Sequence, residues 1–272
     1  MESTLFEDSA DYVQSLARGL QVLRAFDREM ASPSLSQVAE RTGLSRAVAR
    51  RLLLTLQHLG YVGSQGRSFY LTPRVLELGY SYLTSLDLTD LAQQSLALLA
   101  ERVGESCSMA VLDGQDIVYV LRVPVRRVMS VALGVGARLP AYATSMGRAV
   151  LAGHSDAELT AWLRGQKLRA LTPYTVRTAT AFKAQVRQAR DLGYAMVSRE
   201  LDVGLLSIAV PIRTAEGRTV AALNVGMPYS EDAAARAIKV ILPALRDAQR
   251  SVEHAVQHGG WQPHLALSSL YG

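Results

Sequence analysis

Residues 34–62 read SLSQVAERTGLSRAVARRLLLTLQHLGYV, and this stretch decides how the first third of the chain folds. Ser34 followed three residues later by Gln37 is the pattern of a capping box at the start of a helix. Gly43 comes where that helix would end, because glycine readily adopts the positive φ of a helix C-terminus. Ser45 is the expected N-cap of the next helix. Two helices joined by a short turn that contains glycine predict a helix-turn-helix.

Apolar and basic residues separate onto two sides of the second of these helices, which we expect to run to about residue 59. At roughly 100° per residue, one side carries Val48, Leu52, Leu56 and Leu59. The nearly opposite side carries Arg46, Arg50 and Gln57. One side can therefore pack against the domain while the other presents guanidinium groups outward, as a recognition helix in a major groove requires.

The neighbouring segments complete a winged helix. An amphipathic helix before it, ending near Asp27, carries Val13, Leu16, Leu20, Leu23 and Phe26 at three- and four-residue steps. After Gly60 the pattern changes to two β-prone runs, 61–63 and 68–71, around the polar turn 64–67. Thr72 and Pro73 then begin a fourth helix that we expect to link two domains.

Positive charge is concentrated on this element. Residues 34–74 contain six arginines against one acidic residue, Glu40. Arg46 and Arg50 are the best candidates for base contact, since a guanidinium can bind guanine with two hydrogen bonds. Arg67 at the tip of the hairpin suits phosphates or the minor groove. The full set of expected DNA-contact residues is Gln37, Ser45, Arg46, Arg50, Arg51 and Arg67.

The second region alternates between strands and helices. Its expected strands are 106–112, 116–123, 128–133, 194–199, 206–212 and 219–227, and its expected helices are 91–103, 144–152, 156–163, 181–192 and 231–257. Asp113-Gly114 is a strong hairpin signal, and Glu216-Gly217 joins the last two strands. Strands joined by hairpins, with helices around them, predict an α+β domain with an antiparallel sheet. The expected organisation is a disordered leader (1–11), a winged helix-turn-helix (12–72), a linker helix (73–87), a ligand-binding domain (88–258) and a flexible tail (259–272).

Composition limits the class of protein. The 272 residues suffice for two domains, and 49% apolar against 19% charged residues suffice for packed cores. The sequence has no run of about 18 apolar residues, so we expect no membrane span, and its acidic start does not resemble a secretory signal. Cys107 is the single cysteine, which fits a reducing cytoplasm. We expect neither a metal nor a cofactor: the one i,i+4 histidine pair, His254 and His258, has no third ligand close by.

Several motifs, in order, resemble the IclR-type transcription regulators. They are SLARGLQVL, the 34–62 stretch, YLTPRVLELG, LPAYATSMGRAVLA, DVGLLSIAVPI and AALNVGMP, and together they cover about residues 12–256. Within that family LSRAVARRLLLTL, ESCSMAVLDGQDIVYVLRV and RLPAYATSMGR look like the subgroup that controls aromatic acid breakdown through the β-ketoadipate pathway.

The resemblance implies a GAF-like effector domain in a homodimer or dimer of dimers that binds operator DNA on the nucleoid, modulated by a small carboxylic acid. Protocatechuate, 4-hydroxybenzoate and β-ketoadipate are the candidate effectors. The effector residues carried over by motif are Leu139, Ser145, Met146, Leu205, Ser207, Asn224 and Gly226. Several relatives have two serines where Asn224 and Gly226 stand here, and an acid where Val197 falls.

The residues themselves also favour an anionic ligand. Residues 143–147 lead into a helix, where free backbone N–H groups and hydroxyls attract anions. Four arginines flank nearby strands and could pair with carboxylates: Arg122, Arg126, Arg127 and Arg138. Strand alternation places Cys107 on the face opposite Ser106 and Ser108.

An alternative hypothesis makes the second region an enzyme acting on an acyl or phospho substrate, with the N-terminal helices only dimerising. Ser145 and His154 would be its nucleophile and base, but they are nine residues apart and no third member is evident. Cys107 has no histidine near it in sequence and is typical of inert packing. A module that acts only through protein contacts would leave the exposed arginines unexplained. The sequence therefore favours a regulator without enzymatic activity.

Overall fold

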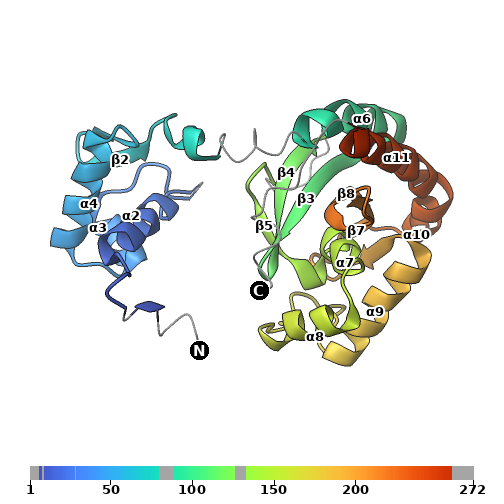
Figure 1. Ribbon diagram of the computed structural model, residues 1–272. Helices are drawn as coiled ribbons and strands as arrows, with labels where there is room; N and C mark the ends of the chain where they lie inside the picture. Colours follow the sequence, from blue (N-terminus) through green and yellow to red (C-terminus); the bar gives the residue numbers. More distant parts are fainter. Residues whose placement is uncertain (1–5, 8, 28, 80–87, 126–132, 259–272) are drawn as a thin grey trace. The chain divides into compact units, whose positions relative to one another are not determined.

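The computed structural model describes residues 6–7, 9–27, 29–79, 88–125 and 133–258 (Figure 1). The chain divides into two compact units, Met1–Tyr82 and Leu83–Gly272. Four expected features lie wholly or partly outside the described residues: the leader at 1–5 and 8, the end of the linker helix at 80–87, the strand segment 128–132, and the tail 259–272.

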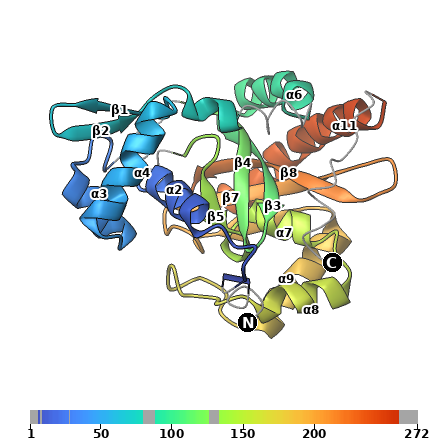
Figure 2. The same cartoon turned by 60° about the vertical axis from the view of Figure 1, so that its left-hand side comes forward.

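The first unit is a winged helix-turn-helix. Its elements are α2 (Gln14–Arg24), α3 (Leu35–Thr42), α4 (Arg46–His58), β1 (Val62–Gln65) and β2 (Ser68–Leu71), and residues 75–79 begin the expected fourth helix. Figure 2 shows β1 and β2 as an extended hairpin beside α4. The strands pair antiparallel around the two-residue turn Gly66-Arg67. The sequence prediction of three helices and a wing is confirmed.

The expected caps are present in the turn between α3 and α4. Ser34 Oγ accepts the Gln37 N–H at 3.4 Å, and the Ser34 N–H donates to Gln37 Oε1 at 2.9 Å. Gly43 has φ of 67°, a conformation that a β-carbon would strain, and it ends α3. Ser45 Oγ accepts the Val48 N–H at 3.3 Å at the start of α4.

The apolar faces of two helices differ from the sequence prediction. On α4 the buried side chains are Ala49, Leu53 and Leu56, whereas Leu59 is 47% exposed and Gln57 is half-buried. The buried stripe is displaced by about one residue because α4 packs against both α2 and α3, and Leu59 lies beyond the last turn. Gln57 does not project outward: its Nε2 donates to Ser64 Oγ of the hairpin at 2.9 Å.

A similar correction applies to α2. The core of this unit takes Val22, Ala25 and Phe26 from this segment. The predicted packing residues at its beginning are exposed instead: Val13, Leu16 and Leu20. Their periodicity is helical as expected, but within this unit they form an uncovered apolar stripe.

The second unit is built on one six-stranded antiparallel sheet in the order β5-β4-β3-β8-β7-β6. The strands are β3 (Ser106–Asp113), β4 (Asp116–Val123), β5 (Arg138–Pro140), β6 (Ala195–Ser198), β7 (Leu205–Arg213) and β8 (Thr219–Pro228). The α+β prediction is confirmed. Sequence reasoning missed β5, which has only three residues and therefore no readable alternation.

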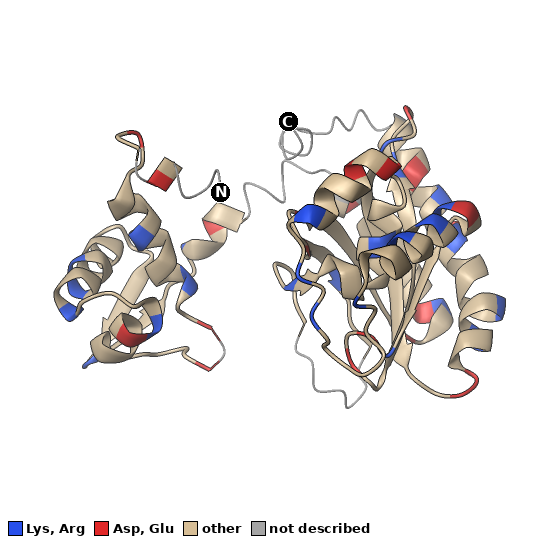
Figure 3. Ribbon diagram, turned by 90° about the horizontal axis from the view of Figure 1, so that it is seen from below, with Lys and Arg blue, Asp and Glu red and all other residues tan. Residues whose placement is uncertain are grey.

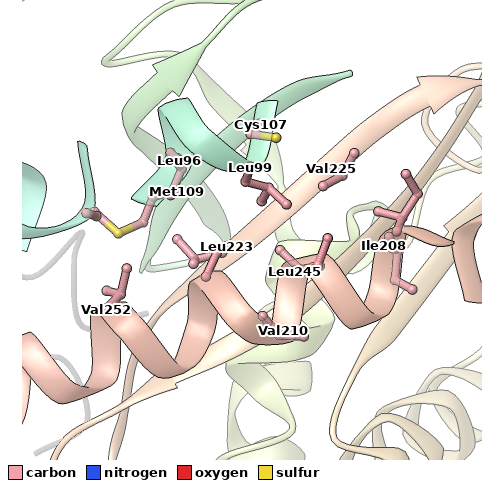
Figure 4. Packing of buried hydrophobic residues seen from close by; sticks show 14 of the residues in the cluster. Leu96, Leu99, Cys107, Met109, Ile208, Val210, Leu223, Val225, Leu245 and Val252 are labelled. Atoms are coloured by element: carbon pink, nitrogen blue, oxygen red, sulfur yellow. The ribbon is translucent and has the colours of Figure 1, made fainter. Parts of the chain in front are cut away.

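Helices cover both faces of this sheet (Figure 1). They are α6 (Leu88–Val103), the 3₁₀ turn η1 (Ala141–Ala143), α7 (Ser145–Leu151), α8 (Asp156–Arg164), α9 (Ala179–Leu192), α10 (Ala233–Arg236), the π-turn η2 (Ala237–Ile241) and α11 (Leu242–His258). On one face, α6 and α11 pack on β3, β7 and β8 through Leu99, Leu223 and Leu245, among others (Figure 4). On the other face, α7, α8 and α9 pack through Met146, Trp162 and Phe182.

Candidate DNA interface and ligand cavity

Exposed arginines gather on α4 and the hairpin. Arg46, Arg50 and Arg51 on α4 and Arg67 in the hairpin turn are exposed, and the described residues supply no ion-pair partner for any of them. Figure 3 marks the basic and acidic positions along the ribbon. Two other arginines of this unit are engaged: Arg41 pairs with Asp27, and Arg74 pairs with Glu77 at 3.4 Å. Arg18 and Arg24 lie on α2, outside this group. The guanidinium groups of these four residues on α4 and in the hairpin turn have no ion-pair partner among the described residues and are therefore available to an external anion.

The hairpin is fixed to the helices by backbone contacts. The Phe69 N–H donates to the Pro33 carbonyl at 2.9 Å, and Ser68 forms a bridge with Ser34 just before α3. The Thr72 N–H donates to the Tyr61 carbonyl at 3.0 Å. These contacts hold the turn that carries Arg67 in one place relative to α3.

Two other expected DNA-contact residues also serve as caps. Ser45 Oγ is occupied by the first turn of α4, although its side chain is at the surface. The exposed Gln37 uses Oε1 to accept the Ser34 N–H and hydroxyl. Its amide N–H groups are thus the part that can contact DNA.

A cavity of about 360 Å³ lies in the second unit, between the sheet and α7. All seven residues carried over by motif line it: Leu139, Ser145, Met146, Leu205, Ser207, Asn224 and Gly226. Sequence reasoning missed several other lining residues, among them Tyr119, Glu105, Glu200 and Asp202. These residues lie on strands or loops distant in sequence, so only the sheet register brings them to the same site.

Two cross-strand rows form the polar floor of the cavity. The serine row runs from β3 to β6 through Ser106, Gly226, Ser207 and Val197. The arginine row runs from β4 to β8 through Arg122, Ser108 and Asn224. Neighbouring strands are about 4.8 Å apart, so each row presents its side chains at short, regular intervals.

Helix α7 forms the opposite wall. Thr144 Oγ1 caps it by accepting the Gly147 N–H at 3.1 Å. A β-carbon on Gly147 would lie 2.1 Å from the Ala141 carbonyl oxygen, so the glycine lets the helix pack directly on η1. This close packing turns Ser145 and Met146 toward the sheet. The expectation of several free N–H groups is only partly met, because the capping hydroxyl occupies one of them and α7 has just seven residues.

A buried ion pair joins this wall to the loop after β6. Arg148 Nη1 and Nη2 donate to Glu200 Oε1 and Oε2 at 2.8 and 2.7 Å, and the two side chains are only 3% and 7% exposed. The Val176 N–H also donates to Glu200 Oε2 at 2.9 Å, and the Tyr142 carbonyl accepts from Arg148 Nη2 at 3.1 Å. Geometry of this kind favours a charged pair even without water.

Some of the charged side chains that line the cavity have an ion-pair partner among the described residues, and others do not. Glu105 pairs with Arg236 at 2.6 Å, and Asp202 Oδ1 accepts the Gly204 N–H at 2.7 Å. Arg122 is half-buried; its Nη1 donates to Ser108 Oγ at 3.2 Å, and it forms no ion pair with a described carboxylate. Two buried lining atoms, Ser145 Oγ and Asn224 Oδ1, have no hydrogen-bond partner among the described residues.

Other candidates from the sequence lie elsewhere. Arg138 pairs with Asp113 and Asp116 outside the cavity lining, and the hydrogen bond to Asp113 raises the pKa of its guanidinium. Arg126 and Arg127 lie outside the described residues. Cys107 points to the α6 face, as strand alternation predicted, and burial raises the pKa of its thiol to about 12.

The enzyme hypothesis gains no support from this geometry. His154 does not line the cavity that contains Ser145, and its ring Nδ1 lies 3.3 Å from the Val150 carbonyl of the preceding helix, α7. Within the described part of the chain, no group of three or more potential metal-ligating side chains occurs, and no helix is long and apolar enough to cross a membrane.

The class of protein follows from the two units together. A winged helix-turn-helix with unpaired surface arginines, followed in the same chain by an α+β unit with a lined cavity, defines a ligand-responsive DNA-binding transcription regulator. The sequence profile described as the IclR helix-turn-helix domain matches residues 15–66, and that of the bacterial transcriptional regulator IclR C-terminal matches residues 80–254. The chain belongs to the IclR family.

Similar proteins agree with this assignment. The Pca regulon regulatory protein of Pseudomonas putida is 41% identical over 92% of this chain and 86% of its own length. A transcriptional regulator from Rhodococcus sp. RHA1 has a TM-score of 0.80 at 49% identity, covering 90% of this chain and 98% of its own. An IclR homolog from Microbacterium hydrocarbonoxydans, solved in complex with 4-hydroxybenzoate, has a TM-score of 0.78 at 25% identity, covering 89% and 99%. The chain is a regulator, not an enzyme.

Proposed function

We propose that this regulator binds operator DNA through α4 and the hairpin, and that a small aromatic carboxylic acid in the cavity modulates that binding. The single observation that carries the ligand half is the cavity itself. It is large enough for one substituted benzene ring, has Leu139, Met146 and Leu205 as apolar lining, and has one basic lining side chain among the described residues, Arg122. The 4-hydroxybenzoate complex of the Microbacterium hydrocarbonoxydans relative supports an aromatic acid.

The DNA half of the proposal assigns roles to the exposed residues of the first unit. Arg46 and Arg50 contact base edges in the major groove, and Ser45 and Arg51 contact phosphates beside them. Arg67 reaches the backbone or minor groove from the hairpin, and Gln37 adds a contact through its amide N–H groups. Support comes from their exposure and from the lack of ion-pair partners among described residues.

The proposal includes a homodimer or a dimer of dimers, acting in the cytoplasm on the nucleoid. The exposed stripe of Val13, Leu16 and Leu20 on α2 supports it, since a second copy of the same apolar surface would cover these side chains. A dimer would also place two recognition helices on two half-sites of one operator.

Thermal denaturation of the full-length protein with candidate effectors tests the ligand half. A ligand that binds only the native state raises Tm in proportion to its saturation. We expect 4-hydroxybenzoate or protocatechuate to raise Tm and an aliphatic amine of similar size to leave it unchanged. A Tm unaffected by any aromatic acid, at concentrations up to the millimolar range, would remove the proposed effector class.

A further inference from the structure

We infer that the cavity selects a monocarboxylate that also carries a hydroxyl group, with Arg122 pairing with the carboxylate and Asn224 with the hydroxyl. The inference rests on the proposed effector site and narrows its ligand. A hydroxylated benzoate has both groups, whereas a keto-dicarboxylate such as β-ketoadipate has two anions and no hydroxyl donor. Asn224 is therefore a specificity-determining residue that distinguishes between effectors of similar size.

The described lining residues supply one cation without a carboxylate partner to the cavity. Arg122 is the single basic side chain among the described lining residues. The acidic lining side chains are Glu105, Glu200 and Asp202. Arg236 and Arg148 neutralise the first two, but no described cation pairs with Asp202. One ligand carboxylate thus compensates Arg122, whereas a second would find no other unpaired cation among the described lining residues and would lie near the carboxylate of Asp202.

The buried amide of Asn224 supplies the contact for the hydroxyl group. Its side chain is only 7% exposed, and its Oδ1 has no hydrogen-bond partner among the described residues. An unpaired buried acceptor costs free energy that a donor from the ligand recovers. A hydroxyl can donate to this oxygen, whereas carboxylate and ketone oxygens have no proton to donate.

The arginine row sets the spacing between the two contacts. Arg122 is on β4 and Asn224 on β8, with Ser108 of β3 between them. The two outer backbones are therefore about 10 Å apart. Arg122 extends toward Asn224, because its Nη1 donates to Ser108 Oγ on the strand between them. Tyr119 and Met146 line the same space, so the ring itself contacts apolar surface. The row is thus suited to a flat ligand with an anion at one end and a donor at the other.

Three probes separate these features in calorimetric titrations of the full-length protein. Benzoate has the carboxylate alone, 4-hydroxybenzoate adds the donor, and terephthalate replaces that donor with a second carboxylate. We expect 4-hydroxybenzoate to bind about fivefold to tenfold more tightly than benzoate, as one hydrogen bond to a buried partner provides. Terephthalate is expected to bind more weakly than benzoate.

Two variants assign the contacts to residues. Asn224→Leu keeps the volume of the side chain but removes the amide, so it should bind 4-hydroxybenzoate and benzoate equally, with benzoate affinity near that of wild type. Arg122→Gln should weaken both ligands by the same factor of about ten or more. If Asn224→Leu does not fold, the wild-type ranking of the three probes is a sufficient test by itself.

The outcomes distinguish this inference from the function on which it rests. Equal affinity for all three probes, or tighter binding of terephthalate than of 4-hydroxybenzoate, would overturn the inference and leave the aromatic effector site standing. Retention of the hydroxyl preference by Asn224→Leu would overturn the role of that residue. Failure of every probe to bind would contradict both the inference and the proposed effector class.

Discussion

Helices α4 and α7 use arginine in opposite ways. Each begins after a hydroxyl N-cap, Ser45 in one and Thr144 in the other, and each carries arginine within its first turns. Arg50 of α4 is exposed and has no ion-pair partner among the described residues, whereas Arg148 of α7 is buried in a two-pronged pair with Glu200. The residue type is the same, and its surroundings decide what it does.

The difference shows which charges are free to act on a ligand. A buried guanidinium needs a partner, because removing its charge from water without compensation costs roughly several kcal/mol. The guanidinium of Arg148 is therefore held by Glu200, and this ion pair joins α7 to the loop after β6, which are two walls of the same cavity. An exposed guanidinium that has no partner in the protein is hydrated, and it can exchange this water for a phosphate or a base. In this chain the buried Arg148 joins two walls of the cavity, and the exposed arginines of α4 and the hairpin turn form the proposed DNA surface.

The largest effect is expected from breaking the buried pair. Glu200→Gln leaves Arg148 as a buried charge without its carboxylate partner, which should destabilise the ligand-binding unit by about 3–5 kcal/mol. Chemical denaturation, followed by circular dichroism, measures this change. A double replacement, Arg148→Met with Glu200→Leu, removes both charges and should recover much of the loss. A single variant as stable as wild type would show that the pair does not hold these walls together.

A smaller effect with a different readout is expected on α4. Arg50→Ala should weaken operator binding by about 1–3 kcal/mol, the value of one good base contact. Its Tm and its affinity for effector should stay unchanged, because the side chain supports no described contact within the protein. Fluorescence anisotropy with labelled DNA and a parallel melting curve give both quantities. A loss of Tm together with DNA binding would make Arg50 structural, like Arg148.

The hairpin arginine should have a weaker and less sequence-dependent effect. A phosphate contact from Arg67 adds affinity for any sequence, so Arg67→Ala should weaken specific and non-specific DNA by similar factors. The slope of log affinity against log salt should fall in magnitude by about 1. Binding measured between low and physiological salt tests this. A change confined to one operator sequence would place Arg67 against a base instead.

The smallest effect is expected from an exposed pair. Arg138 contacts Asp113 and Asp116, but all three side chains are more than one third exposed. Arg138→Ala should therefore change the free energy of unfolding by less than about 1 kcal/mol. Comparison with Glu200→Gln in the same assay shows how strongly burial amplifies an arginine-carboxylate pair. Equal losses of unfolding free energy in the two variants would contradict the claim that a buried arginine-carboxylate pair stabilises the protein more than an exposed one.

The sequence predicted the winged helix well because its signals are local. The capping box of Ser34 and Gln37, the positive φ of Gly43 and the turn of the hairpin each depend on a few neighbouring residues. The buried sides of α2 and α4 were predicted incorrectly, because periodicity shows which side of a helix is apolar but not which elements pack against it. Leu16 and Leu59 are exposed for this reason.

The cavity was predicted only where a motif carried it. The seven motif residues line one space, yet the ion pair of Arg148 with Glu200 was not predicted, although Arg148 stands in the motif LPAYATSMGRAVLA. They are 52 positions apart, and nothing local distinguishes a buried arginine from a surface one. The rows across the sheet likewise depend on strand register, which fixes Arg122, Ser108 and Asn224 as neighbours. Contacts between residues that are distant in sequence could not be predicted from the sequence alone.

One measurement tests most directly the central claim that the cavity controls the arginine-bearing surface. The affinity of the full-length protein for DNA from upstream of its own gene should be measured by anisotropy with and without saturating 4-hydroxybenzoate. We predict specific, salt-sensitive binding whose affinity changes by at least about fivefold with the acid, the lower end of typical allosteric coupling. Specific binding that is identical with and without every aromatic acid that binds the cavity would contradict the account.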